Sequence, residues 1–332
     1  MSHQKPGISR FEFHLASCET LLTKAAKQNN PGLWLYKNNF RTAIFMLEGL
    51  SKLYASIHNR KKFTKLRERF KFLEDALGAA DYYDCFAKEF TGNKNIPRTA
   101  VNYLKDQFKQ RIISLNGTLA DKEWLTGKRI HKIKTALKNC DWEKPEKETG
   151  HLYDYYRDEI KKIIDFVNER KFHFENVEAD VHELRRKLRW LSIYPQALRG
   201  CIQLTQNKKT AKYLEKYLTK EIVGSPFNKM PDAENNTYFL MLEQNHFYAL
   251  SWMIAELGKI KDNGLRIFAV QEAVKQTEKL NDADALKRAS TLLGKQQPAI
   301  SQLLSQAESI TTIFFKEKNL EALVNGKAAV KA

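Results

Sequence analysis

The sequence predicts an all-α protein of about 10–12 helices that pack as helical bundles. Apolar residues recur every three or four positions through most of the 332-residue chain, which is the spacing of one face of a helix. The alternating apolar and polar pattern of half-buried strands is almost absent. Only 14 glycines and 8 prolines interrupt the periodic segments. These three observations favour helices joined by modest connections.

Turn-forming residues set the ends of the helices in the first half of the chain. The first helix runs from about residue 11 to 27 and stops at NNPG, because this combination disfavours a continued helix. Helices at 33–57 and 60–92 follow. The same periodicity predicts helices at 97–115, 121–139 and 152–170, with a polar loop at 141–150.

The second half is expected to contain further helical segments of the same kind. They begin around 181–189 and continue at 208–220, 234–258, 263–280, 283–293 and 298–323, with a turn-rich loop at 224–236. The chain therefore divides into an N-terminal lead (1–10), a first helical bundle (11–170), a second helical bundle (171–323) and a flexible tail (324–332).

Positive charge is the clearest functional signal in the composition. Lysine and arginine number 56 against 39 aspartates and glutamates, which gives a formal net charge of +17. The hydrophobic fraction of 42% is enough for packed cores, so a disordered basic tail is excluded. Because so positive a protein repels itself, the excess indicates an anionic partner such as nucleic acid, an anionic membrane surface or a phosphate polymer. Solubility alone is the alternative explanation.

One nine-residue pattern occurs twice, as IHKIKTALK at 130–138 and VHELRRKLR at 181–189. On a helix, each copy has an apolar stripe and, one position later, a stripe of histidine and basic residues. The basic stripes are His131, Lys134 and Lys138, and His182, Arg185 and Arg189 with Arg186 beside them. Cations repeated about every 5 Å could meet successive phosphates of an extended polyanion. A solvated face of an ordinary amphipathic helix is the alternative.

A second repeat indicates two related halves. Leu-Gly occurs at 77–78 and at 257–258, each followed by an aspartate, and a helix bearing Arg41 or Arg185 precedes each pair. The basic run at 60–72 adds a further stripe of Lys62, Lys65 and Arg69. This stripe either extends the anion-binding surface or is merely solvated.

His182, Arg185 and Arg189, followed by LGKIKD ending at Asp262, resemble the motif of the CHAD family, named for a conserved-histidine α-helical domain. That motif, His-x-x-Arg-x-x-x-basic followed by Leu-Gly-x-x-x-Asp, occurs twice in the family. The resemblance spans about residues 11–323. It implies two pseudo-symmetric antiparallel four-helix bundles with a basic surface at their junction, and binding of inorganic polyphosphate.

The first half departs from the family motif. Arg41 is kept, but Asn38 stands where the histidine belongs, and Phe45 and Met46 stand where the motif is usually basic. We therefore expect the second half to contribute more to binding. The predicted polyphosphate-binding residues are Arg41, Lys62, Lys65, Arg69, His131, Lys134, Lys138, His182, Arg185, Arg186 and Arg189.

No motif predicts catalysis, a metal or a cofactor. The chain has no glycine-rich phosphate loop, HExxH, GxSxG or CxxC. Glu243 and His246, three positions apart, are interpreted as structural because no second such pair accompanies them. We expect a binding protein, with RNA or single-stranded nucleic acid as the alternative partner, or an acidic protein as a third candidate.

The expected location is the cytoplasm, with polyphosphate granules as a candidate place within it. The N-terminus lacks the apolar run of a signal peptide, and no window approaches the roughly 18 apolar residues of a membrane helix. Membrane insertion is therefore not expected. The four cysteines lie far apart and are predicted to be reduced thiols.

Overall fold

The computed structural model describes residues 5–205, 210–233 and 236–329, and it confirms that the chain is mostly helical. Its α-helices in these ranges are α1 (Pro6–Ala25), α2 (Pro31–Lys37), α3 (Phe40–Ile57), α4 (Arg60–Phe90), α5 (Arg98–Asp121), α6 (Lys128–Lys138), α7 (Pro145–Glu169), α8 (Glu183–Ala197), α9 (Lys220–Val223), α10 (Gln244–Glu278), α11 (Asp282–Leu293) and α12 (Ile300–Lys316). A π-turn at Val177–His182 leads into α8, and 3-10 turns form at Lys212–Tyr217 and Pro226–Asn228.

A small mixed sheet corrects the prediction of a purely helical chain. Its strands are β1 (Ile202–Thr205), β2 (Tyr238–Glu243) and β3 (Val324–Ala329). The order is β1-β2-β3, with β1 parallel to β2 and β3 antiparallel to it. β2 was expected to belong to a helix at 234–258, because a short apolar run has no periodicity that separates a strand from a buried helix.

Both ends of the chain contain regular structure that the sequence did not predict. α1 begins at Pro6, inside the expected lead, and proline suits the first turn of a helix because its missing N–H is not needed there. Residues 324–329, expected to be a flexible tail, form β3 instead. The remaining parts of both segments, 1–4 and 330–332, lie outside the described residues.

Two helix boundaries differ from the predicted ones, at asparagines that break a helix and at a glycine that does not. The helix expected at 33–57 breaks into α2 and α3 at Asn38 and Asn39, and Asn39 adopts a left-handed φ of 55°. α10 instead continues for 35 residues through the expected break at 258–263. An isolated glycine such as Gly258 is tolerated inside a long, well-packed helix.

Further segments differ from the predicted ranges: α5 continues to Asp121, α6 begins only at Lys128 and α12 ends at Lys316. α7 begins at Pro145, inside the expected loop at 141–150, so the helix expected at 152–170 is two turns longer at its start. The helix expected at 208–220 is a 3-10 turn over 212–217, and residues 208–209 lie outside the described residues.

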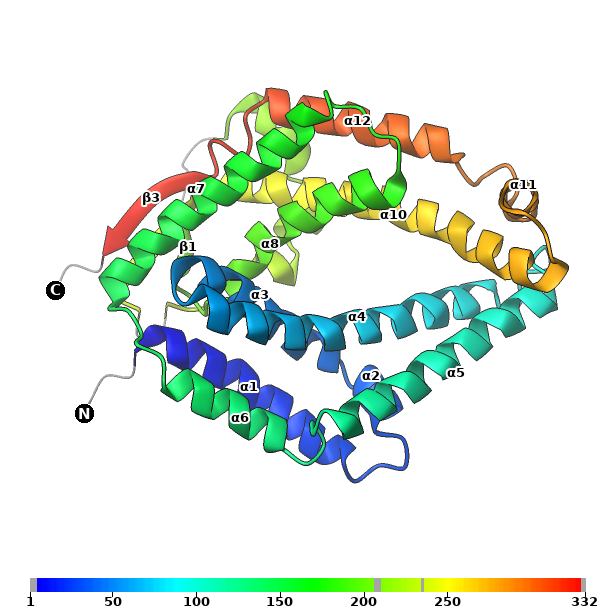
Figure 1. Cartoon of the computed structure of the whole chain (residues 1–332). Coiled ribbons are helices and arrows are strands. Elements are labelled where there is room, and N and C mark those ends of the chain that lie inside the picture. The colour runs from blue at the N-terminus through cyan, green and yellow to red at the C-terminus, as the bar shows by residue number, and fades with distance from the viewer. Residues whose placement is uncertain (1–4, 206–209, 234–235, 330–332) are drawn as a thin grey trace.

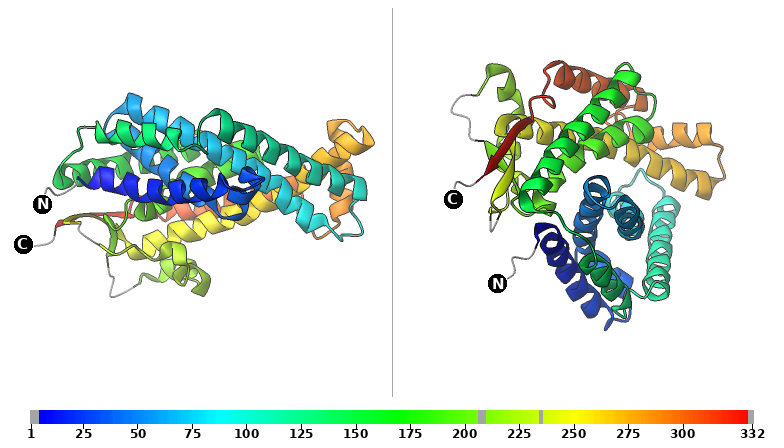
Figure 2. Two further views of the ribbon diagram at one scale, coloured as in Figure 1. Left: turned by 90° about the horizontal axis from the view of Figure 1, so that it is seen from below. Right: turned by 60° about the vertical axis from the view of Figure 1, so that its left-hand side comes forward.

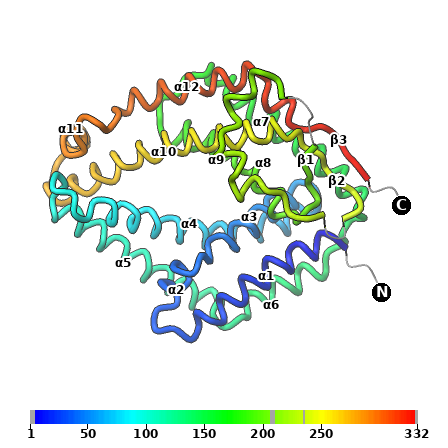
Figure 3. Tube along the Cα trace, turned by 180° about the vertical axis from the view of Figure 1, so that it is seen from behind, coloured from blue at the N-terminus to red at the C-terminus, as the bar shows by residue number. Residues whose placement is uncertain are grey.

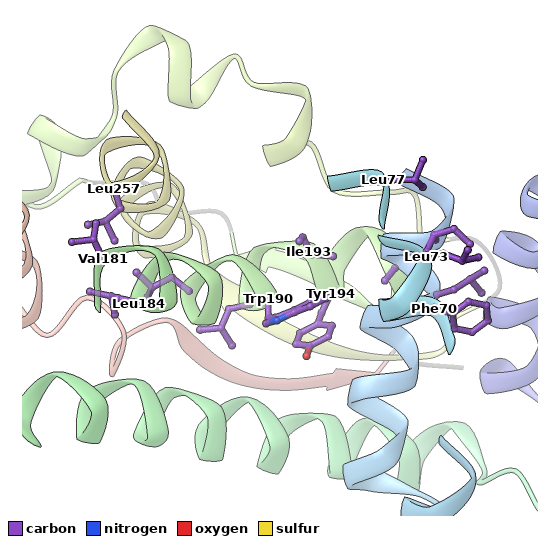
Figure 4. Packing of buried hydrophobic residues seen from close by; sticks show 14 of the residues in the cluster. Phe70, Leu73, Leu77, Val181, Leu184, Trp190, Ile193, Tyr194 and Leu257 are labelled. Atoms are coloured by element: carbon purple, nitrogen blue, oxygen red, sulfur yellow. The ribbon is translucent and has the colours of Figure 1, made fainter. Parts of the chain in front are cut away.

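The apolar stripes of the two repeated segments are buried, as predicted. Val181, Leu184 and Leu188 have no exposed surface, and the corresponding stripe of α6 is buried as well. Figure 4 shows Leu257 of α10 lying close to Val181. The periodicity therefore identified the inward face of both helices correctly.

The helix α8 lies between α3 and α10 and packs against both. The helices α4 and α10 both extend away from α8 toward the same far end of the molecule. They converge there, and α10 packs on α5 (Figures 1 and 3). At this far end, Glu272 accepts hydrogen bonds from the hydroxyls of Tyr83 (2.8 Å) and Tyr103 (2.9 Å), and Arg266 pairs with Glu89. The two halves of the chain are thus joined at this far end through α10 and α5, and also through the packing of α8 on α3.

A buried ion pair joins α1 to α7 at the other end of the molecule, where β3 also lies beside α7 (Figure 2). Arg10 donates hydrogen bonds to Glu148 and to the hydroxyl of Tyr54, and Tyr54 donates to Glu148 at 2.6 Å. Arg10 and Glu148 are 4% and 2% exposed. Because an uncompensated buried charge is very costly, these side chains fix how α1, α3 and α7 dock.

Candidate anion-binding cleft

A cavity of about 990 Å³, which we call the cleft, is lined by α3, α4, α7, α8, α10 and the π-turn before α8. Its volume lies at the upper end of the range for small-molecule sites. The lining comes from both halves of the sequence, because α8 and α10 face the helices α3 and α4 of the first half across it.

The charges that line the cleft are mixed in sign. Ten lysines and arginines and eight aspartates and glutamates contribute to the lining. Most of the cations are paired: Lys52 with Glu159 at 2.8 Å, for example, and Lys261 with its neighbour Asp262 at 2.7 Å. The wall of the cleft is therefore not uniformly basic. An anionic ligand would bind most favourably to the cations that lack a carboxylate partner.

Arg185 and Arg189 are such cations: within the described residues, neither has a carboxylate oxygen within 4 Å of its guanidinium. Arg185 donates its Nε–H to the backbone carbonyl of Ile254 at 3.1 Å. The guanidinium of Arg189 lies over the ring of Phe45, 4.5 Å from its centroid. Arg189 reaches solvent in the cleft, but protein surrounds much of its side chain. This burial, with the nearby charges of Arg185 and Arg41, lowers the pKa of Arg189 to about 10, so it stays protonated at neutral pH.

Each half of the chain places one arginine over a helical glycine. A Cβ added to Gly78 on α4 would lie 2.7 Å from Nη2 of Arg41, and one added to Gly258 on α10 would lie 3.1 Å from Nε of Arg185. Because glycine has no side chain, the two Leu-Gly repeats let these arginines lie directly against the backbone of α4 and α10. Arg41 differs from Arg185 in being paired with two carboxylates on α4.

The π-turn places His182 at the edge of the cleft. Asn176 precedes the turn and accepts hydrogen bonds from the backbone N–H groups of Glu178 and Ala179. His182 then contacts Glu178 through Nδ1 at 2.8 Å. Single π-turns are common at functional sites because they redirect one side chain relative to the helix that follows. Arg186 also lines the cleft but pairs with Glu183 at 2.6 Å.

Six of the eleven predicted residues do not line the cleft. Lys62 donates to the carbonyls of Ala136 (3.3 Å) and Asn139 (3.1 Å), so it caps the end of α6. Lys134 pairs with Glu19. The remaining four are Lys65, Arg69, His131 and Lys138, of which Arg69 is half-buried and the others are exposed. The two copies of the nine-residue pattern are therefore not brought together in one site.

Several cleft residues were missed by the sequence analysis. Phe45 stacks on Trp190 with ring centroids 4.8 Å apart, and Lys52 lies 5.5 Å from the Trp190 ring. Arg67 and Lys71 belong to the same basic run as the predicted stripe on α4 but face the cleft instead. For Phe45 the sequence held an indication, because Phe45 stands at a position where the family motif is usually basic. Trp190, Lys52, Arg67 and Lys71 follow only from which faces of α8, α3 and α4 line the cleft, and the sequence does not determine that.

Glu48 is a buried carboxyl group in the wall of the cleft, only 4% exposed. The guanidinium of Arg67 lies close to it, with Nε 3.9 Å from Oε1 of Glu48. Burial raises the pKa of Glu48 to about 7, and the negative charge of Glu74 adds to this effect. The Arg67 Nε–H is itself buried without a hydrogen-bond partner in the described structure. This part of the cleft therefore changes charge near neutral pH.

Comparisons with known proteins yield no family model, no curated protein and no solved structure that matches this chain. Within the described ranges, no cluster of three or more histidine, cysteine, aspartate or glutamate side chains is placed to hold a metal ion. Across the same ranges, no helix combines the length and apolarity needed to cross a membrane. The function is argued below from the geometry of the cleft.

Proposed function

We propose that this protein binds inorganic polyphosphate in the cleft, without a catalytic step. The observation that carries the proposal is the convergence of three arginines from two halves of the chain, of which Arg185 and Arg189 lack carboxylate partners in the described structure. A phosphate chain between them would replace mutual repulsion by attraction. Guanidinium groups suit this role because they bind phosphate oxygens through two parallel hydrogen bonds.

Preorganisation strengthens the proposal. Arg185 is held by the carbonyl of Ile254 and rests against Gly258, while Arg189 is held by the ring of Phe45. Side chains that are already ordered lose less conformational entropy when a ligand binds. Binding through phosphate oxygens alone carries no base specificity, which suits a uniform polymer.

We also infer that the chain consists of two related halves, each an antiparallel four-helix bundle, which meet at the cleft. The equivalent placing of Arg41 over Gly78 and of Arg185 over Gly258 supports this inference. It is the arrangement that the resemblance to the CHAD family implies, with a first half that has lost its histidine and a basic residue.

The test is a double charge reversal in the cleft. Arg185→Glu with Arg189→Glu should nearly abolish binding of polyphosphate of defined length, measured by titration at physiological salt. The matched control is Lys105→Glu with Lys109→Glu, which makes the same change in net charge at the same i, i+4 spacing on exposed positions of α5. Circular dichroism should show unchanged helix content in both variants.

If both double variants lose affinity equally, net charge rather than the cleft drives binding, and the proposal is wrong. Competition between polyphosphate, a single-stranded RNA and an acidic protein at equal charge separates the alternatives. If RNA or the acidic protein binds in preference to polyphosphate, that competitor becomes the proposed partner.

A further inference from the structure

The cleft has a second, apolar end that a purely anionic polymer does not require. Beyond the arginines, its lining continues with Tyr82 and Phe86 of α4 and with Leu265 and Phe268 of α10. Tyr82, Leu265 and Phe268 are only partly buried. Cationic and aromatic surfaces are therefore adjacent within one cavity of about 990 Å³.

Phe268 is the least explained residue of this apolar end. It is half-buried and lines the cleft, yet within the part of the chain that the structure describes it neither belongs to the hydrophobic core nor packs against it. Among the described residues, its ring stacks on no other ring, whereas Tyr82 meets Tyr83 and Phe86 edge-on, each at 5.1 Å between centroids. The fold uses the rings of α4 but leaves the Phe268 ring without a stacking partner.

The spacing between the two ends suits a ligand with a phosphate tail and one planar group. Along α10, Phe268 lies ten residues beyond Gly258, which corresponds to about 15 Å. Along α4, Tyr82 lies four residues beyond Gly78, or about 6 Å. The separation along α10 is comparable with the length of an extended nucleoside triphosphate from its terminal phosphate to its base.

We propose that the cleft binds a nucleoside 5′-triphosphate or longer nucleoside polyphosphate, with the phosphates at Arg185 and Arg189 and the base stacked on Phe268. This inference rests on the proposed anion-binding function of the cleft and adds the substrate class. Stacking a base on an aromatic side chain does not depend on which base is present, so the site would select the phosphate tail and the planar group.

The test compares adenosine triphosphate with inorganic tripolyphosphate by isothermal titration calorimetry. Tripolyphosphate carries more negative charge, so electrostatics alone would make it the tighter ligand. We expect adenosine triphosphate to bind about tenfold more tightly, the effect of one stacked base. Phe268→Leu should remove this difference while leaving the tripolyphosphate affinity unchanged, and Phe268→Tyr should preserve it.

The control is Phe72→Leu, the same substitution at a ring on α4 that is 55% exposed and does not line the cleft. It should leave both affinities unchanged. Equal or weaker binding of adenosine triphosphate in the wild type overturns the nucleoside inference but leaves polyphosphate binding standing. Failure of tripolyphosphate and long polyphosphate to bind at all overturns the proposed function itself.

A nucleoside triphosphate could be a free nucleotide or the 5′ end of an RNA. A short oligonucleotide with a 5′-triphosphate distinguishes these sources. Affinity equal to that of adenosine triphosphate assigns RNA 5′ ends as ligands, and much weaker affinity assigns the free nucleotide. In either case, Phe268→Leu should weaken binding of the ligand to about the affinity of tripolyphosphate.

Discussion

Arg41 and Arg185 rest on equivalent glycines but contact different groups. Arg41 pairs with Glu74 at 2.8 Å and Asp81 at 3.1 Å, whereas Arg185 contacts a backbone carbonyl. A phosphate must compete with two carboxylates for Arg41 but not for Arg185. Arg41→Ala should therefore weaken polyphosphate binding less than Arg185→Ala, as measured by titration at fixed salt. A larger loss for Arg41→Ala would show that the first half is the principal anion site.

Glu48 should make stability depend on pH. Its pKa is raised to about 7 in the folded protein, above the usual value near 4.3 in an unfolded chain. Between these values the folded state holds a proton that the unfolded state has released, so the free energy of unfolding falls as pH rises through this window. Glu48→Gln should therefore stabilise the protein by about 1–3 kcal/mol at pH 8 and have little effect near pH 4.5.

Urea denaturation at pH 4.5, 6 and 8 measures this effect. Glu68→Gln is the control, because Glu68 is an exposed glutamate on α4. A constant difference between wild type and Glu48→Gln at all three pH values would contradict the expected titration. Ionised Glu48 also adds negative charge to the cleft, so lowering the pH through 7 should favour anion binding more in the wild type than in Glu48→Gln.

At the scale of elements, the surface of α10 around Gly258 positions Arg185. A methyl group there would lie 3.1 Å from Nε of Arg185, a tight contact that the arginine must relieve by moving. Gly258→Ala should therefore weaken polyphosphate binding several-fold. It should also leave the helix intact or stabilise it, because alanine exceeds glycine by about 1 kcal/mol in helix propensity.

Thermal unfolding and titration of the same sample separate these two effects. Gly264→Ala is unsuitable as a control because Val177 lies against it, whereas Gly150→Ala on α7 meets no neighbouring atom. Gly150→Ala should raise stability without changing affinity. Equal polyphosphate affinity of the wild type and Gly258→Ala would mean that Gly258 does not position Arg185 for binding.

Helices were more predictable than strands or contacts. The segments that became α4 and α11 were placed within a few residues, because their apolar stripes extend over several turns. β2 was missed because FLML gives no distinct period, and β3 because its NGKAA sequence is polar and short. Such strands depend on tertiary pairing more than on intrinsic preference.

The candidate site was predicted only in part, for a geometric reason. Helical spacing correctly grouped His182, Arg185 and Arg189 on one face. The same spacing does not predict that α6, which carries the matching pattern, packs on α1 away from the cleft. Periodicity fixes which residues share a face of one helix, but the partner of that face follows from the packing of the whole chain.

At the scale of the whole molecule, the net charge of +17 predicts a steep dependence of binding on salt. Each phosphate contact releases condensed counterions, so affinity should fall continuously as salt is raised from 50 to 200 mM. The slope of log affinity against log salt should be smaller for the Arg185 and Arg189 double variant than for the wild type. A flat response in the wild type would exclude phosphate contacts as the source of affinity.

The ion pair between Arg10 and Glu148 has a consequence for biosynthesis. These residues are 138 positions apart. At about 5–20 residues per second, Glu148 is added about 7–28 s after Arg10. During that interval α1 carries a cation whose partner does not yet exist, and burying it alone would be strongly unfavourable. We therefore expect α1 to be made first but to dock late in the nascent chain, after α7 has left the ribosome.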